Sequence, residues 1–231
     1  MVEEIAALLV RSGAGWVLYV LLGMSVVALT ISLERGLAFL RNRADFASRA
    51  AELRARLERE PLEAVQAWLE RQRGVDAWVV AAGLESAPQG VRSAEASMAA
   101  RLGLARRDLS RGLVWLGTIG SNAPFVGLLG TVIGVVGAFD ALGTSAGRGG
   151  AEALAPERVM STIGEALVAT AVGLLVAIPA IMAFNHFHTR IQQVLADAET
   201  LGQLLVARLH GPALAQYGAD HGEGPGLAAE E

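Results

Sequence analysis

A single carboxylate stands inside a long apolar stretch of the sequence. Between Arg158 and Arg190 the only acidic side chain is Glu165, and His186 and His188 lie at the far end. A carboxylate within an apolar membrane segment is costly unless it faces protein or water. Glu165 is therefore predicted to be an ion-pathway residue or an interhelical anchor. The alternative is that it lies close enough to the membrane surface, seven residues after Arg158, to be solvated.

Hydroxyl side chains recur in the apolar regions around this carboxylate. They are Thr118, Ser121, Thr131, Thr162 and Thr170. Each can bond a carbonyl of its own helix or contribute to a polar lining. Glu165 and Thr170 are five residues apart, about 140° around a helix. One chain does not have to present both on one face, so a pore would need different faces from several copies.

Small residues and prolines indicate how these segments pack. The small residues at helical spacing are Gly127, Gly130, Gly134 and Gly137 in one segment and Gly173 in the other. Faces of this kind let helix backbones approach closely in lipid. Pro124 and Pro179 each free a backbone carbonyl, which requires packed protein, a hydroxyl or water nearby.

Other chemistries find no support in the sequence. The chain has no cysteine, which excludes a disulfide scaffold and a cysteine-ligated metal. It has no P-loop, GxSxG or HExxH motif, so we predict no enzymatic activity, no cofactor and no metal site. A net charge of −4 argues against binding to nucleic acid.

Composition and charge-free runs predict an all-α polytopic membrane protein. The chain is 53% hydrophobic and 18% charged, whereas an ordinary soluble domain is about 25% charged. Three apolar runs reach the length of about 20 residues that crosses a bilayer. We predict three transmembrane helices, of which the long second and third extend beyond the bilayer into a cytoplasmic helical domain. They are placed at residues 14–34, 113–141 and 160–187.

Arginine placement predicts the orientation. All 19 basic residues are arginine, and 14 of them lie from Arg35 to Arg111, clustered near both ends of that segment. The positive-inside rule then places this segment in the cytoplasm, the N-terminus in the periplasm and the C-terminus in the cytoplasm.

The parts between the spans complete the predicted organisation. They are a periplasmic segment at 1–12, a cytoplasmic helical domain at 35–112, a periplasmic loop at 142–158, a cytoplasmic helical extension at 188–210 and a disordered tail at 211–231. Pro61 and Pro88 divide the cytoplasmic domain into three predicted helices. The extension carries an apolar stripe from Ile191 to Leu209 that must meet this domain or another subunit.

Two segments resemble the MotA/TolQ/ExbB proton channel family. Residues 116–139, LGTIGSNAPFVGLLGTVIGVVGAF, are similar to the second span of the family, and residues 164–180, GEALVATAVGLLVAIPA, to the third. Three spans are closer to the TolQ and ExbB branches than to the flagellar branch, which has four. Two departures are Ile133, where a Trp is usual, and the segment 161–164, where Pro-Gly-Ile-Ala is usual. The second departure leaves the Thr162 hydroxyl one turn from Glu165.

The resemblance implies a homopentamer around a dimer of a single-span partner similar to TolR or ExbD. The family's partner carries an essential Asp in its span, next to threonines of the pentamer. By motif match these are Thr131 and Thr170, and the family's intramembrane Glu is Glu165. Together with Thr162, they form the predicted proton pathway.

The predicted function is that of an inner-membrane motor subunit driven by the proton-motive force. It would transmit energy to an envelope process such as import, envelope integrity or gliding motility, through a TonB/TolA-like or motility effector. The alternative is a structural membrane protein whose glycine faces assemble an envelope complex without conducting ions.

Overall fold

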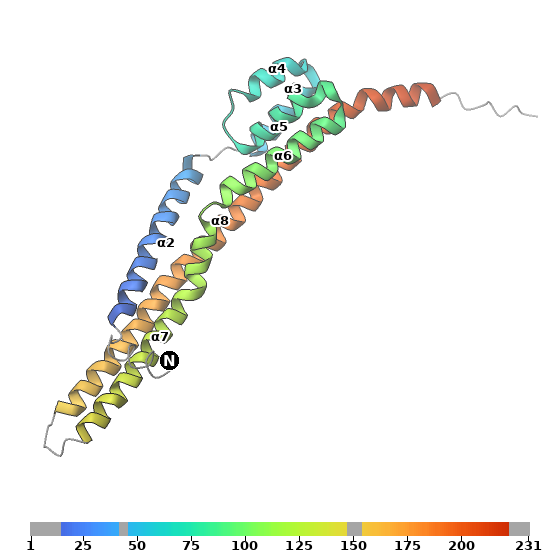
Figure 1. The fold of residues 1–231 in the computed structure, drawn as a ribbon. Helices are drawn as coiled ribbons and strands as arrows, with labels where there is room; N and C mark the ends of the chain where they lie inside the picture. The colour runs from blue at the N-terminus through green and yellow to red at the C-terminus, as the bar shows by residue number, and fades with distance from the viewer. Residues whose placement is uncertain (1–14, 42–45, 147–153, 222–231) are drawn as a thin grey trace, which may run out of the picture. The chain divides into compact units, whose positions relative to one another are not determined.

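Helices make up nearly all of the described residues. The computed structural model describes residues 15–41, 46–146 and 154–221, and no strand occurs within these ranges (Figure 1). The α-helices are α2 (Gly15–Arg41), α3 (Phe46–Arg59), α4 (Leu62–Leu69), α5 (Val75–Ser86), α6 (Val91–Ser110), α7 (Leu113–Ala146) and α8 (Leu154–His221), with a 3-10 helix η1 (Ala87–Gln89) between α5 and α6. The all-α prediction is confirmed.

Three helices are long and apolar enough to cross a membrane, which confirms the predicted number of spans. Their apolar parts are Gly15–Phe39, Leu113–Gly143 and Val159–Gly211. A helix rises about 1.5 Å per residue, and a bilayer core is about 30 Å thick. The 34 residues of α7 and the 68 residues of α8 therefore exceed one bilayer thickness.

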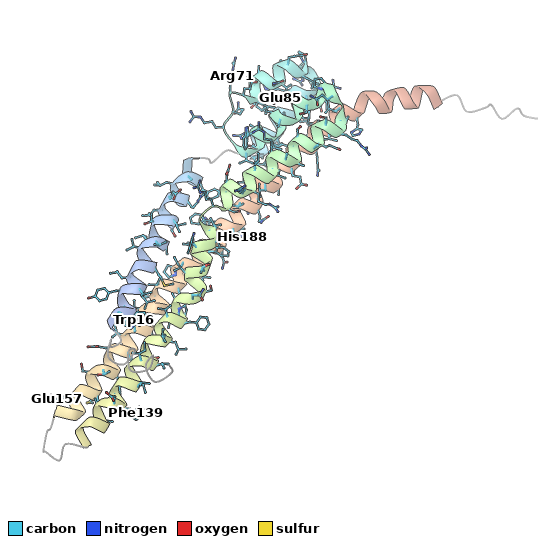
Figure 2. All side chains as sticks on the ribbon, viewed as in Figure 1. Trp16, Arg71, Glu85, Phe139, Glu157 and His188 are labelled. Carbon is cyan, nitrogen blue, oxygen red and sulfur yellow. The ribbon has the colours of Figure 1, made fainter. Side chains whose placement is uncertain are left out.

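The chain divides into two compact units. We call residues 1–38 and 112–188 the membrane unit, and residues 39–111 and 189–231 the charged unit. In the membrane unit, large apolar side chains face outward. Phe139 on α7, labelled in Figure 2, is 68% exposed, and Tyr19 on α2 is 77% exposed. Surfaces of this kind suit lipid or further protein rather than water.

Glycines in the left-handed region separate some of the helices. Gly74, with φ of 150°, lies between α4 and α5, and Gly112, with φ of 84°, lies between α6 and α7. A residue with a Cβ rarely adopts such a φ. The prediction of three helices between the first two spans is wrong, because Gly74 adds a break that prolines alone do not reveal. The same region contains α3, α4, α5 and α6.

The charged unit has its own apolar core, to which α8 contributes. Ala198, Leu201 and Leu205 of α8 are at most 1% exposed and share one cluster with Leu53 of α3 and Val80 of α5. The apolar stripe predicted at residues 191–209 therefore packs against the helical segment that follows the first span. This is the first of the two predicted alternatives, the other being a contact with another subunit. The α8 helix also includes residues 211–221, which the sequence predicted to be disordered. Their Ala-Leu-Ala run favours a helix.

Arg49 is expected to stabilise the charged unit more than its exposed neighbours do. Its Nη1 lies 2.6 Å from an oxygen of Asp76, both side chains being at most 13% exposed, and its Nη2 donates to the Arg73 carbonyl. Replacing Arg49 with alanine should cost about 1–3 kcal/mol, as expected for hydrogen bonds to charged groups.

Thermal unfolding of the purified protein in detergent, combined with hydrogen exchange in α3 and α5, measures this cost. Arg54→Ala is the matched control, because Arg54 pairs with Glu58 on the surface of the same helix with side chains 73% and 61% exposed. Such a pair contributes about 0.3–0.5 kcal/mol. Equal losses in the two variants would contradict the expectation.

Several predicted segments lie outside the described residues. These are the periplasmic segment 1–12, the part of the periplasmic loop at 147–153 and the tail beyond residue 221.

Candidate functional site

The two segments that carry the intramembrane glutamate and threonines form an antiparallel helix pair. Gly120 of α7 lies against Ile181 of α8, Gly127 against Gly173, and Gly134 against Ala166. The numbering rises along one helix as it falls along the other. The seven-residue glycine spacing therefore places one glycine at each contact level, as in helices that pack nearly parallel or antiparallel.

This pair packs closely because its contact face has almost no side chains. A Cβ on Gly127 would lie 2.9 Å from the carbonyl oxygen of Ala169, and one on Gly173 would lie 2.7 Å from that of Ala123. A Cβ on Gly130 would lie 2.8 Å from the Ala169 Cβ and 3.3 Å from Val17 of α2. The predicted packing role of these glycines thus has a geometric basis, with α2 packing beside Gly130.

Thr170 joins the two helices by a hydrogen bond. Its Oγ1 donates to the Gly127 carbonyl oxygen at 3.0 Å. The Thr131 Oγ1, one turn from Gly127 along α7, donates to the Leu128 carbonyl of its own helix at 2.7 Å. Both threonines are half-buried. The structure therefore brings these two hydroxyls to the same level of the helix pair.

Glu165 lies on a different part of the α8 surface. Its side chain is exposed, whereas Ala166 and Ala169 beside it are at most 1% exposed against α7. Glu165 has no hydrogen bond or ion pair with any described residue. Among the described residues, Glu165 therefore joins no two helices.

The remaining predicted residues lie along the same two helices. Thr162 is half-buried, and its Cγ2 lies 3.8 Å from where a Cβ on Gly137 would be. Pro124 is half-buried inside α7, and Pro179 is exposed inside α8. Within the described chain, the structure does not gather Thr162, Glu165, Thr131 and Thr170 into one cluster. That several copies together form a pore stays a prediction.

A polar group on α7 was predicted only in part from the sequence. The Asn122 Nδ2 donates to the Thr118 carbonyl at 2.8 Å and to Ser121 Oγ at 3.2 Å, and all three side chains are exposed. The hydroxyls of Thr118 and Ser121 belong to the predicted polar residues, whereas Asn122 does not. The signal was present, because an amide within a charge-free run is itself unusual in lipid.

Replacing Thr170 with valine should weaken the α7–α8 pair slightly. The variant loses the bond to Gly127, and hydrogen bonds between membrane helices contribute about 0.6 kcal/mol on average. Unfolding in a detergent titration measures the loss. Thr170→Ser keeps the donor and should match the wild type, and Thr131→Val should also match it because that hydroxyl bonds within α7. A larger loss in Thr131→Val than in Thr170→Val would contradict this geometry.

Comparison with known families identifies this arrangement. The sequence model of the MotA/TolQ/ExbB proton channel family matches residues 71–200, more than half of the chain. The chain belongs to this family. The match includes the helices α5, α6 and α7 and the part of α8 up to residue 200.

Relatives of this MotA/TolQ/ExbB chain come from the TolQ and ExbB branches. The biopolymer transport protein ExbB of Xanthomonas campestris pv. campestris is 45% identical over 92 residues, which are 40% of this chain and 34% of that protein. The Tol-Pal system protein TolQ of Pseudomonas aeruginosa is 37% identical over 114 residues, 48% of this chain and 47% of that protein. A putative ExbB-like protein of Helicobacter pylori is 46% identical over 77 residues, 33% of this chain and 47% of that protein. The alignments thus span between a third and a half of these relatives.

Family membership gives the general class of function. The MotA/TolQ/ExbB family is a proton channel family, and three helices long and apolar enough to cross a membrane agree with a multi-pass membrane protein. The predicted TolQ/ExbB branch is confirmed by the relatives.

Proposed function

We propose that this chain is the membrane subunit of a proton-driven motor in the bacterial inner membrane. Five copies would surround two copies of a single-span partner similar to TolR or ExbD, whose span carries an Asp. The observation that carries the proposal is Glu165, an exposed carboxylate inside an apolar helix that forms no hydrogen bond or ion pair with any described residue. A carboxylate in that position requires protein or water outside the chain.

The proposed proton pathway combines residues from several copies with the partner. Thr131 and Thr170 lie at one level of the α7–α8 pair and would line the pore beside the partner's Asp. Glu165, with Thr162 one turn away, would contribute a second polar position. Each proton that crosses a potential of 100 mV releases about 2.3 kcal/mol. That energy would drive motion of the partner relative to the ring.

Arginine placement supports the proposed orientation. The charged unit, rich in arginine near both of its connections to the first two spans, would lie in the cytoplasm. The N-terminus would then be periplasmic and the end of α8 cytoplasmic.

The names of the relatives indicate the class of process that is driven. They are a biopolymer transport protein and a Tol-Pal system protein. We therefore propose that the motor energises an envelope process through a TonB/TolA-like or motility effector that contacts the partner.

Proton flux into vesicles tests this function. The chain is co-expressed with a neighbouring gene that encodes a single span containing an Asp, and the complex is reconstituted with a pH-sensitive dye inside the vesicles. A potassium diffusion potential should then drive acidification. Vesicles with the chain alone should acidify little, because the proposed pathway needs the partner's carboxylate.

Native mass spectrometry of the same preparation separates the remaining alternatives. Five copies with two partner copies and measurable flux support the proposal. An assembled complex without flux would favour the scaffolding function. A chain that stays monomeric would contradict both.

A further inference from the structure

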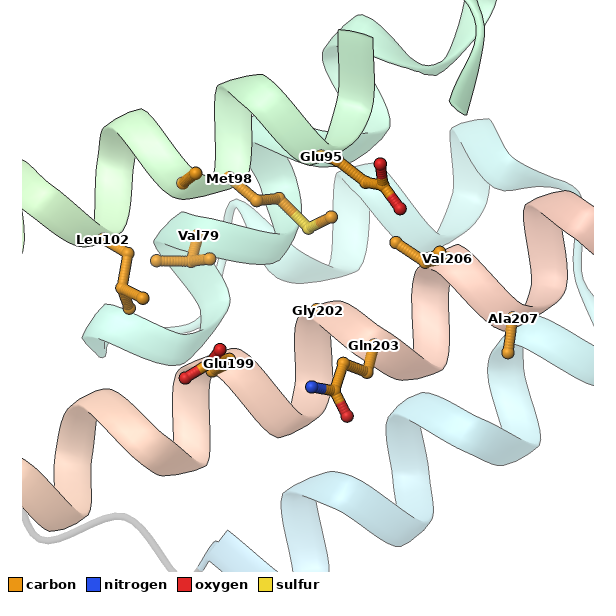
Figure 3. Close-up of a pocket in the computed structure, with 10 residues that line it drawn as sticks. Val79, Glu95, Met98, Leu102, Glu199, Gly202, Gln203, Val206 and Ala207 are labelled. Carbon is orange, nitrogen blue, oxygen red and sulfur yellow. The ribbon is translucent and has the colours of Figure 1, made fainter. Parts of the chain in front are cut away.

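An apolar groove runs between α6 and α8 in the charged unit. It encloses about 400 Å³ and is lined by residues of α6 and α8, with Val79 of α5 at its floor (Figure 3). This volume lies at the small end of the range of ligand pockets, about 300–1,000 Å³, so the groove can accept a large side chain.

Small residues and a methionine line the groove. Met98 is 7% exposed, and a Cβ on Gly202 would lie 3.1 Å from its sulfur. Ala99 and Ala207 on the rims are too short to close the opening. The floor is therefore apolar and adaptable, because a methionine side chain adjusts readily to a partner.

Two carboxylates mark the ends of the groove. Figure 3 shows Glu95 on α6 near Val206 and Glu199 on α8 at the other end. Both are exposed, and neither bonds or pairs with another described residue. The groove therefore suits an apolar side chain that is accompanied by a cation.

A surface with those properties is formed by α5 and α6 outside the groove. The guanidinium carbon of Arg101 lies 4.4 Å above the ring of Trp78, and Trp78 is 43% exposed. Leu104, 51% exposed, lies nine residues after Glu95 and thus about half a turn around the helix from it. We call Trp78, Arg101 and Leu104 the Trp–Arg patch.

We infer that the Trp–Arg patch of one copy docks into the α6–α8 groove of a second copy. The inference rests on the proposed function, because it supplies the contact between neighbours in the ring. Two different complementary surfaces on one subunit generate a head-to-tail contact, which forms a ring when the rotation between neighbours closes. Tryptophan and arginine are the residues that most often dominate such contacts, and the two groove carboxylates complement Arg101.

Cross-linking tests the contact directly, because the chain has no cysteine of its own. Gln203→Cys places a thiol on the groove rim, and Leu104→Cys places one in the Trp–Arg patch. In membranes treated with a short bismaleimide, the double variant should give a ladder of oligomers. A mixture of the two single variants should give dimers only, and each single variant alone should stay monomeric. Glu58→Cys with Gln203→Cys is the control and should give no ladder.

Charge reversal tests the proposed pairing. Arg101→Glu should lower the cross-link yield at least about tenfold, because like charges facing each other cost several kcal/mol. Glu199→Arg or Glu95→Arg in the same chain should restore it. A loss that neither reversal restores would overturn the role of the charges.

Native mass spectrometry of the cysteine variants separates this inference from the proposed function. An intact oligomer without the 203–104 cross-link would overturn the inference and leave the motor function standing. Self-cross-linking of Gln203→Cys alone would indicate a symmetric contact and would also overturn it. Absence of any oligomer would contradict the proposed function as well.

Discussion

Replacing Glu165 with glutamine should abolish proton flux through the reconstituted complex while leaving the chain inserted and assembled. Glutamine keeps the size and polarity of the side chain but cannot release a proton at any physiological pH. Loss of a relay carboxylate should slow flux at least tenfold, which corresponds to a barrier increase of about 1.4 kcal/mol or more. Glu165→Ala should be equally inactive, whereas Glu165→Asp should keep part of the flux.

Glu157→Gln is the matched control for this variant. Glu157 is also an exposed glutamate of α8, but it lies in the first turn of the helix, before the apolar part that begins at Val159. Its replacement should leave flux unchanged. Full flux in Glu165→Gln would show that Glu165 is not part of the proton pathway. Full flux in Thr131→Val and Thr170→Val as well would overturn the proposed motor.

Replacing Gly173 with valine should separate α7 from α8. Any side chain at this position meets the Ala123 carbonyl oxygen at 2.7 Å and the Gly127 Cα at 3.2 Å, and both contacts are with backbone that cannot move aside. Overpacking in a closely packed core costs about 1–3 kcal/mol. A detergent unfolding titration should therefore show a marked loss of stability, and native mass spectrometry should show fewer intact complexes.

Gly164→Val provides the comparison on the same helix. A Cβ at Gly164 meets nothing within 4 Å, so this variant introduces the same β-branched side chain without a clash. Its stability should stay close to that of the wild type in a single chain. Equal destabilisation of the two variants would show that helix propensity, rather than the α7–α8 contact, decides the outcome.

The sequence reveals the spans better than their ends. Charge-free runs identify α2, α7 and α8 because only an apolar segment can cross a bilayer. They do not show where a helix stops, since helical hydrogen bonding continues past the last apolar residue. For this reason α2 continues through Glu34 and Arg35 to Arg41.

Contacts between segments that are far apart in the chain could not be predicted from the sequence. The 140° separation of Glu165 from Thr170 followed from helical geometry alone, and the structure agrees with it. The bond from Thr170 to the Gly127 carbonyl depends on the register of two antiparallel helices, which no local pattern specifies. The groove at Met98 likewise depends on α6 and α8 lying side by side. In the sequence, the only local sign of this groove is that Glu199, Gly202 and Val206 recur at the spacing of one helix face.

The glycine-rich contact between α7 and α8 also determines where movement can occur. Glycine and alanine lose no rotamer freedom when they are buried. Separation of the two helices would therefore gain little side-chain entropy. Its close contact also leaves little space for the helices to slide. The pair should therefore behave as one rigid element during the working cycle. Structural changes that follow protonation are then expected at the outer faces of the pair, between copies, rather than within one subunit.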